Sequence, residues 1–175
     1  MWKTLHRIGS VGVVTETPPQ QDEQLRVREH LQAQILRTLG RALCIRQIDA
    51  GSCNGCELEI HALNNAFYNL EGLGIRFVAS PRHADLLLVT GPVARNMELA
   101  LKRTYDATPD PKLVVAIGDC GCTGGIFDSS YASLGSVANV IPVNVAVPGC
   151  PPHPNRILAG ILTAITPAAT QSSDP

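Results

Sequence analysis

The chain has 175 residues, of which 45% are hydrophobic and 17% are charged, a balance typical of one globular domain rather than a disordered chain. Its formal net charge is −1 and its aromatic content is 4%, so neither a basic patch nor a base-stacking surface for nucleic acid is expected. The six cysteines are therefore the part of the composition that carries functional information.

Residues 1–21 are predicted to form an extended arm that precedes the domain. The segment Thr17–Gln21 is a polar, proline-marked break between the two. The arm has no clear core to join, so we expect it to lie on a partner subunit or a membrane partner, or to be disordered in isolation. Its apolar residues are Trp2, Leu5, Ile8, Val11, Val13 and Val14.

A single domain over residues 22–166 follows, and residues 167–175 form an alanine-, serine- and proline-rich tail that is expected to be flexible. The domain begins with a helix that Asp22 caps and Gly40 ends. Apolar residues recur at every fourth position of this helix, and this stripe favours core packing over a docking role. The stripe comprises Val27, Leu31, Ile35 and Leu39.

Apolar segments then alternate with amphipathic ones along the rest of the domain. Strands are predicted over residues 43–48, 75–79, 85–90, 112–118 and 143–147, and helices over 57–70, 92–105 and 154–165. The first of these helices is expected to bury Ile60, Leu63, Phe67 and Leu70. The alternation predicts an α/β, flavodoxin-like fold of three layers with a mainly parallel sheet. A ligand site is expected at the carboxyl edge of the strands.

Four cysteines lie in loops that follow predicted strands. Cys53 and Cys56 follow the first strand, Cys120 follows the fourth, and Cys150 follows the fifth. Because the carboxyl ends of parallel strands meet at one edge of the sheet, we expect these cysteines to converge there. Four thiolates suit a zinc ion or an iron–sulfur cluster. One close pair with two distant singles, a proline after Cys150 and glycine-rich loops favour a [4Fe–4S] cluster.

Other interpretations of the cysteines stay open at this point. A structural zinc-binding scaffold is the alternative from another functional class. A thioredoxin-like redox pair accounts for the Cys53–Cys56 spacing but leaves Cys120 and Cys150 unexplained. Cys44 lies inside a predicted strand and is expected in the core. Cys122 is ambiguous, because it lies two residues after Cys120.

Four motifs occur in order along the domain: S-C-N-G-C-E-L-E-I (Ser52–Ile60), T-G-P-V-A-R-N-M (Thr90–Met97), G-D-C-G-C-T-G-G-I-F (Gly118–Phe127) and P-G-C-P-P-H-P (Pro148–Pro154). Together they resemble the small subunit of energy-converting [NiFe] hydrogenases of the formate hydrogenlyase type. They also resemble the homologous 20-kDa (B) subunit of respiratory complex I. The resemblance covers about residues 43–165.

This resemblance implies that Cys53, Cys56, Cys120 and Cys150 bind one [4Fe–4S] cluster, and that Cys122 is not a ligand. The complex I subunit carries two adjacent cysteines at the first motif, so the two-residue spacer here favours the hydrogenase-like branch. The chain would be a non-catalytic subunit that passes electrons between a ferredoxin-like iron–sulfur subunit and a large subunit. That large subunit would carry nickel and iron or, in the complex I alternative, help to form a quinone site. Membrane subunits would be indirect partners.

Several polar residues flank the motifs without an expected ligand role. Glu57 and Glu59 lie beside the cysteines and could tune the cluster or join a proton route, although a first-turn acid that favours the helix dipole is the simpler interpretation of Glu57. The others are expected to cap turns, to make hydrogen bonds or to face solvent or a partner: His61, Arg95, Asp119 and His153.

The sequence also bears on localisation. Residues 1–10 contain neither the apolar core of a signal peptide nor a twin-arginine pair. No apolar run approaches the ~20 residues that a membrane span needs, and the longest candidate, residues 157–165, has about half that length. We therefore expect a cytoplasmic chain that is held at the cytoplasmic face of the inner membrane through its partner subunits.

Overall fold

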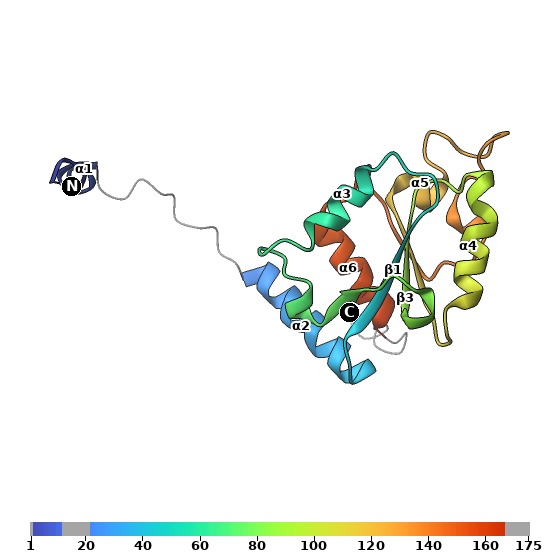
Figure 1. The fold of residues 1–175 in the computed structure, drawn as a ribbon, viewed down its shortest axis with the longest axis horizontal. Coiled ribbons are helices and arrows are strands. Elements are labelled where there is room, and N and C mark those ends of the chain that lie inside the picture. Colours follow the sequence, from blue (N-terminus) through green and yellow to red (C-terminus); the bar gives the residue numbers. More distant parts are fainter. Residues whose placement is uncertain (1, 12–21, 167–175) are drawn as a thin grey trace, which may run out of the picture.

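The computed structural model describes residues 2–11 and 22–166. Its five strands form one wholly parallel sheet in the order β2-β1-β3-β4-β5 (Figure 1). This is the strand order of flavodoxin-like, doubly wound proteins, so the predicted fold class is confirmed. The strands are β1 (Leu43–Asp49), β2 (Ile75–Phe77), β3 (Leu86–Thr90), β4 (Leu113–Ile117) and β5 (Val145–Val147).

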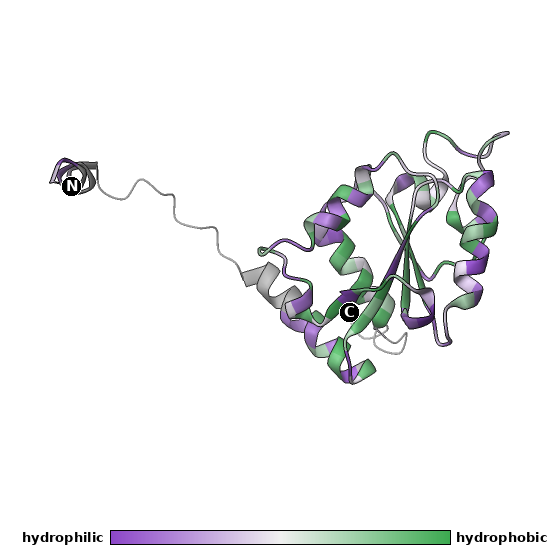
Figure 2. Ribbon diagram, in the orientation of Figure 1, coloured by the Kyte–Doolittle hydropathy of each residue, from purple (hydrophilic) through white to green (hydrophobic). Residues whose placement is uncertain are grey.

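Helices cover both faces of the sheet and make the three layers (Figure 1). On one face α2 (Asp22–Leu39), α3 (Gly55–Ala62) and α6 (Pro154–Ile165) pack in one apolar cluster, and on the other α4 (Arg95–Ala107) packs in a second. Figure 2 shows the apolar strands between polar outer helix surfaces. The remaining helical segments of the domain are α5 (Gly118–Thr123) and the short turns η1 (Glu71–Leu73), η2 (Pro81–His83) and η3 (Val137–Asn139).

Helix α2 follows its predicted apolar stripe. It begins at Asp22 and ends at Leu39, and Gly40 leaves the helix with φ +62°. Leu31 and Ile35 are buried, and Leu39 packs partly buried against the same cluster. The stripe therefore serves core packing, as expected; the side chain of Val27 lies outside the described residues.

Helix α3 is shorter than predicted, since it ends at Ala62 instead of Leu70. The side-chain oxygen of Asn65 accepts hydrogen bonds of 2.9 Å from the backbone N–H groups of both Phe67 and Tyr68. Such a local bond competes with continuation of the helix. Phe67 consequently turns to the surface, where 58% of it is exposed, and its predicted place in the core is wrong.

Helix α4 begins at Arg95, three residues later than the predicted start at Pro92. The backbone N–H of Val93 donates to Gly135, and that of Ala94 donates to Ala50. These bonds hold residues 93 and 94 against two neighbouring loops, so the helix starts only after them. Its one buried side chain, Leu101, faces the sheet cluster.

The predicted extended arm is also corrected over residues 2–11, which form helix α1 (Trp2–Val11). The sequence repeats apolar residues at positions 2, 5, 8 and 11, and a spacing of three residues is compatible with a helix but not with a period-2 extended strand. Residues 12–21 lie outside the described part of the chain, as does the predicted tail over residues 167–175.

Candidate metal centre

Three segments bring the predicted cysteine ligands to the carboxyl edge of the sheet. Cys53 and Cys56 lie between the end of β1 and the first turn of α3, Cys120 lies in α5 directly after β4, and Cys150 follows β5. All five strands are parallel, so these three segments share one edge. The fold therefore places all four predicted residues on the same side of the molecule.

The loop after β1 has to cross β3, because β3 lies between β1 and β4 in the sheet. Gly91, at the end of β3, has φ +77°, and a Cβ atom on it would lie 2.5 Å from the backbone nitrogen of Ser52. Gly51 has φ +127°, and its Cβ would lie 3.0 Å from the carbonyl oxygen of Pro92. These two side-chain-free positions allow the loop to lie directly on the end of β3.

The crossing brings Cys56 onto the end of β4. A Cβ atom on Gly118 would lie 2.6 Å from Cys56 Sγ, and a Cβ on Gly125 would lie 2.9 Å from Cys120 Sγ. Both glycines have a positive φ, of +84° and +56°. Two thiols are thus set in glycine positions that any side chain would fill, which is the close backbone approach that a bulky inorganic group requires.

Asp119 joins the loop of Cys120 to the loop of Cys150. Its backbone N–H donates to the carbonyl of Gly149 over 2.9 Å, and its Oδ1 accepts from the N–H of Gly149 over 2.7 Å. The expected role of Asp119 as a cap for its own turn is therefore replaced by a link between two loops that are 30 residues apart in sequence.

The electrostatics identify the four thiols as neighbours. Burial raises the pKa of the Cys56 thiol to about 12, with further contributions from Glu57 and from the other three cysteines. Burial also raises the pKa of Cys120, followed by Cys150 and Cys53. Four acidic thiols that oppose one another's ionisation form a site that is completed by a positively charged group, since metal ligation requires thiolates.

Cys122 is oriented away from this group. Its Sγ donates to the carbonyl of Ala116 over 3.7 Å, at the sheet side of α5. Burial raises its pKa, against a backbone hydrogen bond from Val147 that lowers it, and Asp119 adds to the rise. None of the four predicted ligands contributes to that pKa, which agrees with the prediction that Cys122 is not a ligand.

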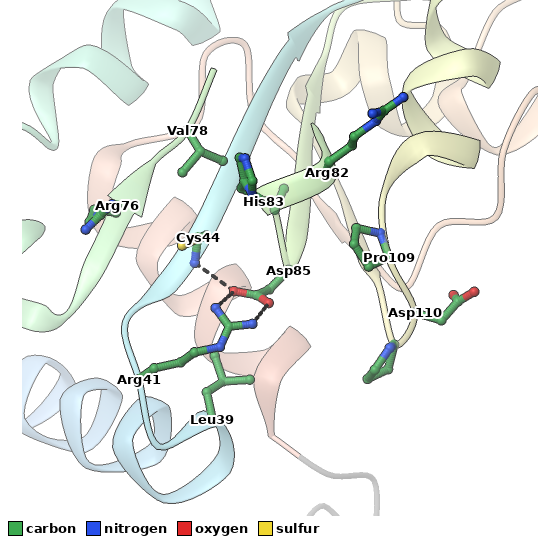
Figure 3. Close-up of a pocket in the computed structure, with 12 residues that line it drawn as sticks. Leu39, Arg41, Cys44, Arg76, Val78, Arg82, His83, Asp85, Pro109 and Asp110 are labelled. Atoms are coloured by element: carbon green, nitrogen blue, oxygen red, sulfur yellow. Dashed lines mark hydrogen bonds and ion pairs between the residues drawn. The ribbon is translucent and has the colours of Figure 1, made fainter. Parts of the chain in front are cut away.

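Cys44 lies at the opposite, amino-terminal edge of the sheet. Figure 3 shows it in the wall of a cavity of about 620 Å³, beside the ion pair between Arg41 and Asp85. Its backbone N–H donates to Asp85 over 2.9 Å, and its Sγ donates to the carbonyl of Ala42. Cys44 is half-buried in the sheet and separate from the candidate metal centre.

The spacing of the thiols bears on which group fits. Within residues 2–11 and 22–166, no group of three or more His, Cys, Asp or Glu side chains is arranged to hold a single metal ion. The four thiols nevertheless interact electrostatically, as their pKa values show. Neighbouring thiols that are too widely spaced for one ion fit a larger cluster better than zinc, and four cysteine sulfurs are the donor set of a [4Fe–4S] cluster.

Glu57 is the flanking residue whose environment is most unusual. It lies in the first turn of α3, next to Cys56, and only 6% of it is exposed. Neither of its carboxylate oxygens has a hydrogen-bond partner among the described residues, an arrangement that costs free energy for a buried polar group. Glu59, by contrast, is only half-buried.

Two other flanking residues have ordinary structural roles. His153 caps α6, since its Nδ1 accepts from the backbone N–H of Asn155 over 3.2 Å. Arg95 Nη2 donates to the carbonyl of Ser130, so it ties the start of α4 to the loop over residues 124–135. His61, in the last turn of α3, is exposed.

The sequence did not predict α5 or the apolar surface that borders the cysteines. Ile126 is 92% exposed and Tyr131 is 94% exposed, and both follow α5 in the loop over residues 124–135. Phe127 in the same loop and Leu58, two residues after Cys56, are also large, apolar and exposed. An apolar surface beside a metal site is typical of a protein–protein contact. The motif G-G-I-F, which ends at Phe127, was the available signal.

In the part of the chain that the structure describes, no helix combines the length and the apolar character that crossing a membrane demands.

Comparison with known proteins adds independent information. The family model described as NADH ubiquinone oxidoreductase, 20 Kd subunit, matches residues 53–164, a range that contains all four predicted ligands. Subunit mbhJ of a probable membrane-bound hydrogenase from Pyrococcus furiosus is 45% identical over 76% of this chain and 80% of its own length. Formate hydrogenlyase subunit 7 from Escherichia coli is 42% identical over 77% of this chain, which spans about half (53%) of that relative.

Relatives of the respiratory type are similar to the same degree. The corresponding small subunit of the NADH-quinone oxidoreductase from Desulfovibrio desulfuricans is 43% identical over 70% of this chain and 66% of its own length. Among solved structures, a chain of the membrane-bound sulfane sulfur reductase, an archaeal respiratory membrane complex, superposes with a TM-score of 0.64. That chain is 34% identical, and the match covers 77% of this chain and 73% of that one.

Proposed function

Because this chain belongs to the family of the 20-kDa subunit of NADH:ubiquinone oxidoreductase, we propose that it is the [4Fe–4S] electron-transfer subunit of a membrane-associated [NiFe] hydrogenase of the formate hydrogenlyase type. The observation that carries this proposal is the convergence of Cys53, Cys56, Cys120 and Cys150 from three loops at one sheet edge. A [4Fe–4S] cluster supplies reversible one-electron transfer, and these four residues would hold it as thiolates.

The rest of the edge would adapt the protein to that group. Gly118 and Gly125 leave room beside Cys56 and Cys120, and backbone N–H groups in such loops stabilise the added negative charge of the reduced state. The positive end of α3 begins at Gly55, between the paired cysteines, and acts in the same direction. The link between Asp119 and Gly149 would hold the other two ligand loops at a constant separation.

The apolar border supports docking of a large subunit over the cysteine edge. Leu58, Ile126, Phe127 and Tyr131 are exposed on segments that adjoin ligands. Covering them would bury apolar surface and exclude water from the cluster. Electrons would pass between this cluster, a ferredoxin-like iron–sulfur subunit and the large-subunit site. The chain itself would be non-catalytic, and its partner subunits would hold it at the cytoplasmic face of the membrane.

Two types of large subunit are compatible with this arrangement. The two-residue spacer between Cys53 and Cys56 supports the hydrogenase type, whereas a quinone site shared with a complex I-like partner is the alternative. Identities of 45%, 42% and 43% to the two hydrogenase relatives and the quinone-reductase relative do not separate them. Purification of the intact complex decides: nickel, and two C-x-x-C pairs near the ends of the large subunit, are expected. Absence of both would reject the hydrogenase type.

The cluster is tested on the chain purified without oxygen. Iron and acid-labile sulfide are expected in about equal amounts, with an EPR signal of a reduced [4Fe–4S] cluster after dithionite addition. About one zinc per chain, without iron or sulfide, would instead establish the zinc-scaffold alternative.

A further inference from the structure

Helix α1 (Trp2–Val11) is the described element that the proposed function leaves without a role. It lies outside the residues that match the family model, 53–164. None of its described residues belongs to either apolar cluster of the domain. The domain therefore does not need this helix for its core.

The helix sorts its residues into two sides. At roughly 100° per residue, positions 2, 5, 8 and 9 fall within about 120° of arc, and positions 3, 6, 7 and 10 fall on the other side. The first set is Trp2, Leu5, Ile8 and Gly9, and the second is Lys3, His6, Arg7 and Ser10. One side is thus apolar and the other is polar and basic. Trp2 is 85% exposed, so its indole has no core contact.

The charge of the helix is opposite to that of the rest of the chain. Residues 2–11 contain Lys3 and Arg7 and no acidic residue, which makes +2. The whole chain is −1, so the remaining residues sum to −3. A negatively charged surface would attract this helix and repel the remainder, and a basic amphipathic helix with a tryptophan is the type that lies in the interface of an anionic bilayer.

We propose that α1 binds the surface of anionic membrane, with the side that contains Trp2, Leu5 and Ile8 in the headgroup boundary and with Lys3 and Arg7 next to lipid phosphates. The chain would then have its own contact with the membrane in addition to that through partner subunits. The helix is too short to span a bilayer, so the contact is peripheral. The proposal depends on the proposed function only in the choice of a membrane-associated complex as its setting.

Trp2 makes this proposal directly testable, because it is the single tryptophan of the chain. The cluster-loaded full chain is mixed with vesicles of phosphatidylcholine alone, or of roughly three parts phosphatidylcholine to one part phosphatidylglycerol. With the anionic vesicles, we expect co-sedimentation, a blue shift of the Trp2 emission and protection from acrylamide. High salt is expected to reverse these changes, because it screens the basic side.

Matched variants separate the two sides of the helix. Lys3→Glu with Arg7→Glu should lower binding to anionic vesicles by about fivefold or more per replaced cation. Leu5→Glu should abolish the blue shift at unchanged net basic charge of the polar side. The control is Arg82→Glu with Arg103→Glu, which changes net charge equally on exposed domain residues and should retain the Trp2 response.

Three outcomes would overturn the proposal. One is a Trp2 emission that neither vesicle type changes; another is a control variant that loses binding as fully as the α1 charge variant. The third is a Trp2 emission that shifts only on addition of the large subunit, which would assign α1 to a protein interface. Iron content measured in the same samples keeps this test distinct from the proposed function, because a loaded chain that ignores vesicles fails here alone.

Discussion

Asp119 and Gly149 are joined by two hydrogen bonds, one from each backbone N–H, of 2.9 and 2.7 Å. Each residue directly precedes a predicted ligand, Cys120 or Cys150. The pair therefore sets the separation of two thiols that belong to different strands of the sheet, and it adds a carboxylate beside them.

Replacement of Asp119 should separate these two effects. Asp119→Ala removes the acceptor for the Gly149 N–H and should lower the free energy of unfolding by about 1–3 kcal/mol, with poorer cluster retention. Asp119→Asn keeps an oxygen acceptor but removes the charge, so it should retain iron and raise the midpoint potential. An EPR-monitored redox titration with iron analysis measures both. An unchanged potential in Asp119→Asn would contradict the electrostatic part.

Gly118 should not tolerate a side chain. Gly118→Ala would place a Cβ atom 2.6 Å from Cys56 Sγ at φ +84°, and the backbone conformation alone costs about 1–2 kcal/mol for a non-glycine residue. We expect loss of most bound iron. Gly121→Ala in the same helix is the matched control, because its Cβ would meet ordinary contacts at 3.5 Å. Equal iron content in the two variants would refute the close approach as a requirement.

The ligand set predicts a division among the six cysteines. Alanine at position 53, 56, 120 or 150 should each abolish [4Fe–4S] assembly, whereas Cys44→Ala and Cys122→Ala should retain it. The reason is the orientation of Cys122 toward Ala116 and the location of Cys44 at the other sheet edge. Iron and sulfide analysis of the six variants measures the division. Retention in Cys120→Ala together with loss in Cys122→Ala would reassign the ligand.

The Cys56 thiol predicts a pH dependence for the metal-free protein. Its pKa is raised from 9.0 to about 12, so the folded state holds this proton more tightly than the unfolded state does. The resulting stabilisation is complete below about pH 9 and is lost as pH rises toward about 12. Urea unfolding of the reduced metal-free chain across this range should show that decline.

Two variants check the cause of this decline. Cys56→Ala should flatten the decline, and Glu57→Gln should lower the pKa of Cys56, because Glu57 is the largest contribution after burial. Alkylation rates of Cys56 against pH report that pKa directly. An identical pH profile in the Cys56→Ala chain would show that another group titrates.

The sequence predicted the regular elements well where the local pattern was strong. All five strands and helices α2 and α6 lie where their apolar patterns placed them. It missed α5, because six residues rich in glycine and cysteine show no helical periodicity. It extended α3 to Leu70, because the apolar spacing continues while the hydrogen bonds of Asn65 end the helix.

The sequence by itself determined the chemistry of the candidate site and the class of fold. Thiol ligands are a matter of residue identity, and alternating apolar segments report a buried parallel sheet locally. Only the tertiary structure decided which thiols meet. Strand β3 lies between β1 and β4, so Cys56 reaches the end of β4 only across Gly91, a contact between residues distant in sequence. The same holds for Cys122, whose exclusion depends on the direction of its side chain.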